Sequence, residues 1–169
     1  LSEVEILEVT QERKGKYVEH FSEEDIGKIK SKNIDFILRF GFGILKGEVL
    51  NAAYWGIWSF HHGDEQKFRG GPPGFWEIMH GEKKEGVILQ RLTENLDAGK
   101  IILKRQYSVL SHSYTENVTK LLMQSADMPA QALRMISCSI INIDSLQDIK
   151  PAAPVYQYPT NLQFLWFQL

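Results

Sequence analysis

Gly56-Ile57-Trp58-Ser59-Phe60-His61 is the stretch of sequence that decides the fold. A short apolar run that begins at a glycine and ends at a polar loop is typical of a buried strand. The run Ile34–Phe40 has the same nearly continuous apolar character and favours a second strand covered on both faces. A short helix is expected between them, over Lys46–Tyr54. Strands that alternate with helices in this way predict an α/β fold with a mainly parallel twisted sheet flanked by helices.

Further elements are expected on either side of this stretch. Ser22 precedes three acidic residues and predicts the start of a helix, because a hydroxyl caps open N–H groups and acids suit the positive end of the helix dipole. Pro129 interrupts an apolar pattern of helical spacing and predicts a break between two helices. The remaining expected segments are strands at Ile6–Val9, Gly86–Leu92 and Lys100–Val109, and helices at Gly74–His80 and across Tyr114–Ile141.

Length and composition bound the class of protein. The 169 residues fit one domain, expected at residues 1–150, followed by a tail of prolines and aromatic residues at 151–169. No apolar run is long enough to span a membrane, and the acidic start, without Met or a basic lead, does not have a signal-peptide pattern. The single cysteine, Cys138, excludes a disulfide framework, favours a cytoplasmic location and is expected to be buried. A net charge of −2 with scattered Lys and Arg argues against a nucleic-acid partner.

Three features carry candidate chemistry. His61 ends a strand, and α/β sheets place their sites at the carboxyl ends of strands. The loop Arg69–Pro73 leads into a helix, which leaves backbone N–H groups and an arginine facing the crevice. Asp97 lies in a glycine-bearing loop between two strands. A histidine and a carboxylate on neighbouring loops can share proton-transfer work, although a single strand-end histidine is more often structural.

The order of these features resembles the folate-dependent formyltransferase family, which includes methionyl-tRNA formyltransferase, glycinamide ribonucleotide transformylase and the sugar N-formyltransferases. That family carries an Asn-x-His strand end, a loop like Tyr-Arg-Gly-x-x-Pro, a Trp-bearing helix, Gly-Asp/Glu-x-x-x-Gly-Val and Leu-Asp-x-Gly-x-Ile. The resemblance covers residues 34–105. Its matching residues are His61, Phe68-Arg69-Gly70, Pro73, Trp76, Gly81-Glu82, Gly86-Val87 and Leu96-Asp97-Ala98-Gly99-Lys100-Ile101. The order and spacing of these weak motifs together are specific.

The resemblance implies a Rossmann-related formyltransferase fold and a reaction that uses 10-formyltetrahydrofolate as co-substrate, with no metal. The residues that it implies as catalytic are His61, Asp97 and Ser59. Those implied for the folate are Phe42, Ile44, Leu45, Glu94, Asn95 and Leu96. Those implied for the acceptor substrate are His62, Asp64, Arg69 and Gly70. His61 and His62 point to opposite faces of a strand, which argues against a shared metal site.

Two departures from the family pattern bear on activity. Ser59 stands where the family has an asparagine, whose amide helps to stabilise the oxyanion, and loss of such a donor costs roughly 10²–10³ in rate. Ser59 is therefore either an ordinary strand serine or a residual oxyanion donor. The family's Ser-Leu-Leu-Pro is replaced by His62-Gly63-Asp64. Few residues precede the first matched strand, so the N-terminal part of the fold is expected to be shortened or absent.

The resemblance leaves several functions open. The charge balance favours a small amine as the acceptor, with an amino sugar attached to a nucleotide as the first choice. The alternatives are a methionyl-tRNA formyltransferase, a formyltetrahydrofolate hydrolase that releases formate, and a non-catalytic folate- or nucleotide-binding module. No membrane contact is expected. The aromatic tail either packs on the domain or contributes to a homodimer.

Overall fold

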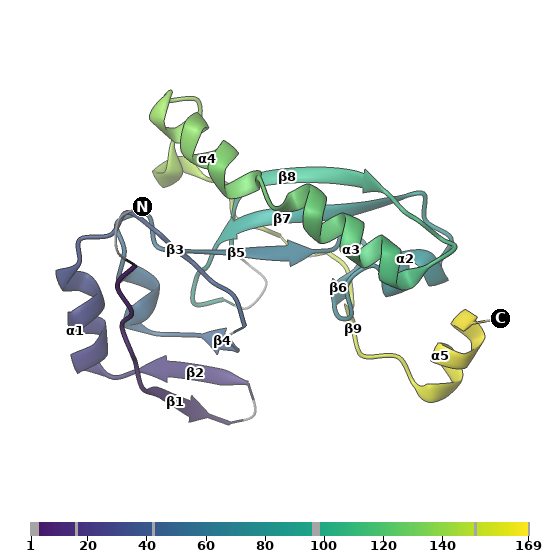
Figure 1. Ribbon diagram of the computed structural model, residues 1–169, viewed down its shortest axis with the longest axis horizontal. Helices are drawn as coiled ribbons and strands as arrows, with labels where there is room; N and C mark the ends of the chain where they lie inside the picture. The colour runs from purple at the N-terminus through teal and green to yellow at the C-terminus, as the bar shows by residue number, and fades with distance from the viewer. Residues whose placement is uncertain (1–3, 16, 42, 96–98, 151, 169) are drawn as a thin grey trace. The chain divides into compact units, whose positions relative to one another are not determined.

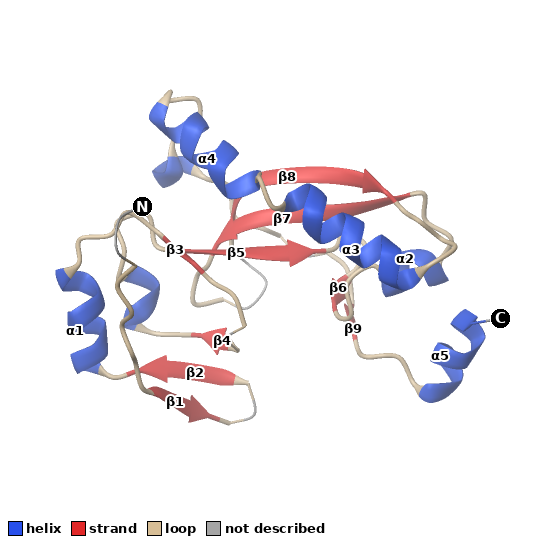
Figure 2. Cartoon of the chain, in the orientation of Figure 1, coloured by secondary structure: helices blue, strands red, loops and turns tan. Residues whose placement is uncertain are grey.

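The computed structural model describes residues 4–15, 17–41, 43–95, 99–150 and 152–168, and the chain forms two compact units. The first unit comprises Leu1–Ser59 and Arg91–Leu96, and the second comprises Phe60–Gln90 and Asp97–Leu169. Both contain strands and helices, which confirms the α/β class (Figures 1 and 2). None of the helices formed by the described residues has the length and apolar character needed to cross a lipid bilayer.

A three-stranded sheet of order β1-β2-β4 lies in the first unit. Its strands are β1 (Gln11–Lys14), β2 (Val18–Phe21) and β4 (Ile44–Leu45). The β1–β2 pair is antiparallel, whereas β2 and β4 are parallel. The sequence did not predict the β1–β2 hairpin, because its residues are mostly polar and carry no apolar alternation.

Helix α1 (Glu23–Ser31) follows β2 in the first unit and begins where Ser22 predicted. The Ser22 Oγ accepts a hydrogen bond from the Asp25 N–H at 3.1 Å, which satisfies one of the open donors of the first turn. The expected strand at Ile34–Phe40 is confined to β3 (Ile37–Leu38), which pairs in parallel with the start of β5 (Ile57–His62). No strand forms at the expected position Ile6–Val9, where Ile6 is exposed.

Aliphatic side chains from these elements form the core of the first unit. A single 3₁₀ turn, η1 (Glu48–Asn51), replaces the expected helix at Lys46–Tyr54 and places Val49 and Leu50 in this core. The buried members of the core are Ile26, Leu45, Val49, Leu50 and Ile57, and Phe21, Ile37 and Leu92 pack against them. Ile57 fixes the first half of β5, so the core determines where the candidate catalytic strand begins.

The second unit is built on the end of β5 together with β7 (Lys84–Arg91) and β8 (Lys100–Ser108), in the order β5-β7-β8. Figure 1 shows β7 running opposite to β5 and β8, so the expected mainly parallel sheet is mixed. The helices and turns of this unit are α2 (Phe75–Met79), α3 (Tyr114–Ser125), α4 (Met128–Ser137), η2 (Ile143–Ser145) and α5 (Asn161–Gln168). The break between α3 and α4 confirms the effect predicted for Pro129, which lies in the first turn of α4. Cys138, expected to be buried, is exposed.

The C-terminal segment packs on the second unit. Strand β9 (Val155–Tyr156) pairs in parallel with β6 (Arg69–Gly70), and the Arg69 Nη1 donates a hydrogen bond to the Ala153 carbonyl at 3.1 Å. The Tyr156 ring lies 5.0 Å from the Trp76 ring between centroids. Tail residues therefore hold the loop that contains Arg69 in place.

Replacement of Gly70 by alanine is expected to destabilise the second unit. An added Cβ would lie 2.1 Å from the Tyr156 carbonyl oxygen, and the Gly70 φ of 90° disfavours any other residue. Gly81→Ala is the matched control, because Gly81 has a φ of 68° but an added Cβ meets nothing within 4 Å. In urea unfolding, Gly70→Ala should lower the free energy of unfolding by about 2 kcal/mol more than the control does. Equal losses would show that β6 and β9 are not paired.

Candidate active site

Strand β5 sorts the candidate residues onto two faces. Side chains alternate along a strand, so Ser59 and His61 share one face, while Trp58, Phe60 and His62 share the other. On the second face, the rings of Phe60 and His62 stack on each other, with their centroids 5.4 Å apart. Ser59 and His61 are therefore the two polar side chains that β5 presents together.

Ser59 is held by an arginine of the first unit. Its side chain is buried, and its Oγ accepts a hydrogen bond from the Arg39 Nη1 at 2.9 Å. The Arg39 Nη2 donates a second hydrogen bond, at 2.8 Å, to the Gly43 carbonyl. Burial lowers the pKa of Arg39, whereas the charge of Glu19 raises it. Sequence reasoning missed Arg39, which stands near the end of the apolar run Ile34–Phe40.

His61 borders a small cavity in the second unit. The cavity measures about 10 Å³, and its lining residues are His61, Glu65, Arg69, Gln90 and Ile149. The Gln90 Oε1 is buried and has no hydrogen-bond partner among the described residues. A polar cavity of about this size holds one water molecule. The structure thus brings Arg69 next to His61, while Glu65 and Gln90 are neighbours that the sequence did not indicate.

Glu77 on α2 is a third neighbour of His61 that sequence reasoning missed. A Cβ added at Gly63 would lie 3.3 Å from the His61 Nε2 and 3.7 Å from the Glu77 Oε1, so both side chains converge on this glycine. Glu77 is 2% exposed. Burial, together with the charges of nearby acidic residues, raises the pKa of Glu77 to about 7. The signal in the sequence was an acidic residue inside the apolar run of a short helix.

His62 lies on the opposite face of β5 from His61 and contacts α3. Its Nε2 is 3.3 Å from the Ser125 Oγ, which donates a hydrogen bond to the Leu122 carbonyl at 3.1 Å. Burial, and to a smaller extent the neighbouring His61, lower the pKa of His62 from 6.5 to about 4. His62 is therefore neutral at pH 7 and ties the strand to the helix. Its role in acceptor binding stays a prediction.

The other residues expected to bind the acceptor have partners in the second unit. The Asp64 Oδ1 accepts a hydrogen bond from the Gln66 N–H at 3.0 Å and lies 3.5 Å from the Lys104 Nζ. Arg69 and Gly70 form strand β6, which pairs with the tail. Among the described residues, histidine, cysteine and acidic side chains do not gather in groups of three that could hold a metal ion.

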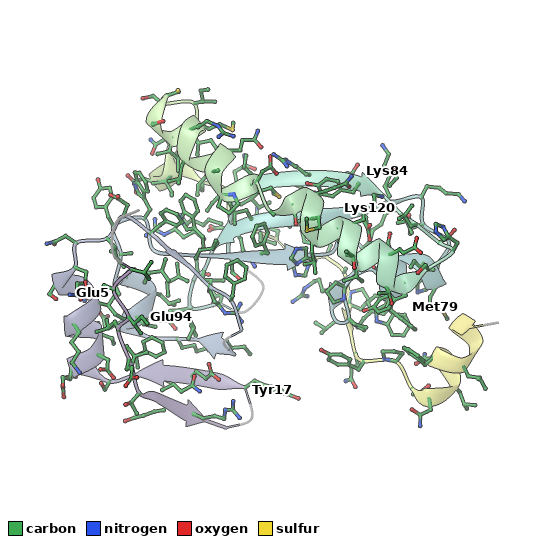
Figure 3. All side chains as sticks on the ribbon, viewed as in Figure 1. Glu5, Tyr17, Met79, Lys84, Glu94 and Lys120 are labelled. Atoms are coloured by element: carbon green, nitrogen blue, oxygen red, sulfur yellow. The ribbon has the colours of Figure 1, made fainter. Side chains whose placement is uncertain are left out.

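The residues expected to bind folate converge in part. Ile44 and Leu45 form β4, and the Gly47 N–H, two residues later, donates a hydrogen bond to the Glu94 Oε1 at 2.9 Å (Glu94 is labelled in Figure 3). This bond joins the two expected folate-binding segments within the first unit. Asn95 directly follows Glu94. The other residues of the expected site, Phe42, Leu96 and Asp97, lie outside the described residues.

Comparison with known proteins gives matches over most of the chain. Residues 4–136 match the family model described as formyl transferase. The methionyl-tRNA formyltransferase of Prochlorococcus marinus is 30% identical over 132 residues, which cover 76% of this chain and 36% of that protein. The methionyl-tRNA formyltransferase of Clostridioides difficile is 36% identical over 120 residues, which cover 67% of this chain and 37% of that protein. The chain thus spans little more than a third of the length of these relatives.

A solved structure supports the fold. Glycinamide ribonucleotide transformylase 1 from Symbiobacterium toebii superposes with a TM-score of 0.61 at 20% identity. The superposition covers 74% of this chain and 61% of that one. At this identity the likeness concerns the fold and does not extend to the substrate.

Replacement of Glu77 by glutamine is expected to remove a pH dependence of stability. The Glu77 pKa is about 7 in the folded protein, against 4.5 for an ordinary glutamate. The contribution of Glu77 to stability is therefore fully present below pH 4.5 and is lost as the pH rises towards 7, because the unfolded chain releases its proton first. This loss is on the order of 3 kcal/mol.

Urea unfolding across this pH range measures the effect. Glu82→Gln is the control, because it removes a half-buried carboxylate that pairs with Lys67 at 2.9 Å. Between pH 4.5 and 7 the free energy of unfolding of Glu77→Gln should rise relative to that of the control by about this amount, because the opposing titration of His62 is common to both variants. The same pH dependence in Glu77→Gln and in the control would contradict the buried state of this carboxyl group.

Proposed function

Because the chain belongs to the formyl transferase family, we propose that its protein transfers a formyl group from 10-formyltetrahydrofolate to an amine. The observation that carries this proposal is the placement of Ser59 and His61 on one face of β5. The hydrogen bond between Gly47 and Glu94 adds support, since it joins the two segments expected to hold the pterin. The reaction needs two side chains that hydrogen-bond the formyl carbonyl oxygen and a surface that binds the folate.

The proposed reaction is a direct transfer. The acceptor amine attacks the formyl carbon, and the carbonyl oxygen becomes an oxyanion that His61 and Ser59 stabilise by hydrogen bonds. Asp97 orients His61 or a water molecule and helps to remove a proton from the attacking nitrogen. The bond between the formyl carbon and N10 then breaks, N10 takes up a proton, and the formylated amine and tetrahydrofolate leave. No bond between enzyme and substrate is formed.

The acceptor that we propose is a small amine, with an amino sugar attached to a nucleotide as the first choice. A net charge of −2 does not favour a large polyanion such as tRNA. Methionyl-tRNA is the second candidate, because the relatives with 30% and 36% identity are methionyl-tRNA formyltransferases. Water as the acceptor would make the protein a hydrolase that releases formate.

A panel of acceptors decides among these candidates. Purified protein with 10-formyltetrahydrofolate is offered nucleotide-linked amino sugars, methionyl-tRNA, or buffer alone, and mass spectrometry detects the formylated product and formate. Formylation of an amino sugar is the expected result. Formate release without an acceptor would indicate the hydrolase, and folate binding without turnover would indicate a binding module.

His61→Asn is expected to lower the turnover number by roughly 10²–10⁴, because the oxyanion loses a positioned hydrogen-bond partner. His112→Asn serves as the control, since His112 is exposed and its Nε2 lies 3.0 Å from the exposed Glu116 carboxylate. Initial-rate measurements on both variants test the assignment. Wild-type rates in His61→Asn would remove His61 from the mechanism.

A further inference from the structure

The serine at position 59 has a charged neighbour, Arg39. We propose that Arg39 is a positioning residue that makes the Ser59 hydroxyl an oxyanion donor and so takes over the work of the family's amide. This inference rests on the proposed function, because it concerns the same carbonyl oxygen. The hydrogen bond from the Arg39 Nη1 to the Ser59 Oγ, 2.9 Å long, is the contact that carries it.

The direction of this hydrogen bond explains how Arg39 acts. A guanidinium group only donates hydrogen bonds, so the Ser59 oxygen is the acceptor. A hydroxyl that accepts from a cation is polarised, and its own hydrogen becomes a stronger donor. Ser59 is only 2% exposed, and this exclusion of water strengthens the effect. A short hydroxyl alone is a weak substitute for an amide, whereas a hydroxyl with a cation behind it supplies the missing electrostatic stabilisation.

Arg39 is itself held from the other side. Its Nη2 donates to the Gly43 carbonyl at 2.8 Å, and the Gly43 N–H donates to the Glu19 Oε2 at 2.8 Å. Glu19 is 3% exposed and supplies the negative charge that a half-buried arginine requires. Only glycine fits at position 43, because an added Cβ would lie 2.5 Å from the Tyr17 carbonyl oxygen. The guanidinium is therefore fixed in one orientation.

The same network links Ser59 to the expected folate-binding segment. Gly43 directly precedes Ile44 and Leu45 of β4, which are expected to lie beside the pterin. Arg39 thus joins the strand that carries the oxyanion donor to the strand that holds the folate, within one unit. A substitution of Arg39 could therefore act on chemistry through Ser59 or on folate binding through Gly43, and the test has to separate these two effects.

The test compares Arg39→Met in two backgrounds. In the protein with Ser59, the substitution should lower the turnover number by roughly 10²-fold while the KM for 10-formyltetrahydrofolate stays within about threefold. In a Ser59→Asn background the amide donates directly, so Arg39→Met should cost less than about fivefold. An equal loss in both backgrounds would show that Arg39 supports only the structure.

Two further variants keep the inference testable. If Ser59→Asn does not fold, Ser59→Ala replaces it, and there Arg39→Met should cause no further loss; a further loss of 10² would overturn the proposal. Arg13→Met is the matched control, because Arg13 contacts Glu19 at 3.2 Å and is 62% exposed. It should leave the turnover number unchanged. A drop in the turnover number of Arg13→Met equal to that of Arg39→Met would show that the loss arises through Glu19 and would contradict the proposed role of Arg39.

A binding measurement separates failure of this inference from failure of the proposed function. Calorimetry compares a stable 10-formyl folate analogue with its deformylated counterpart. The wild type should prefer the formylated analogue, and Arg39→Met should lose that preference. If Arg39→Met loses the preference but the wild type shows no turnover, only the proposed function is contradicted. If the wild type turns over normally and Arg39→Met keeps the preference, only this inference is contradicted.

Discussion

The alternation of side chains along β5 is the constraint on which the candidate site depends. Ile57, in the core of the first unit, fixes the strand, and every second residue after it then faces the same way. Ser59 and His61 follow on that face. The opposite face holds Trp58, which stacks on Phe36 with ring centroids 4.3 Å apart, and His62, which contacts α3. Packing on one face therefore fixes the polar pair on the other.

Charge balance shapes the surroundings of both polar residues. On the Ser59 side, the buried carboxylate of Glu19 compensates the guanidinium of Arg39 through Gly43. On the His61 side, Glu77 lies among other acidic residues, so burial and repulsion raise its pKa to about 7. A carboxyl group that titrates near neutral pH beside a strand-end histidine is typical of functional sites. Burial of polar groups of this kind costs free energy unless they are hydrogen-bonded or paired.

The sequence predicted the elements whose signals are local. Ser22 marked the start of α1, Pro129 marked the break between α3 and α4, and the apolar run before His61 marked β5. Contacts between distant residues carry no such signal. Arg39 and Ser59 are 20 positions apart, and nothing in either neighbourhood indicates that they meet. Glu77 gave a weak indication, as an acid inside an apolar turn, but its position beside His61 depends on tertiary packing.

The proposed reaction requires that His61 and Asp97 reach one crevice. A crystal structure of the protein with a bound folate analogue tests this most directly. The account predicts that the pterin contacts β4 and the segment around Glu94, and that the Asp97 carboxylate and the His61 imidazole both face the analogue's formyl-bearing nitrogen. A structure in which these two side chains lie on opposite sides of the sheet would contradict it.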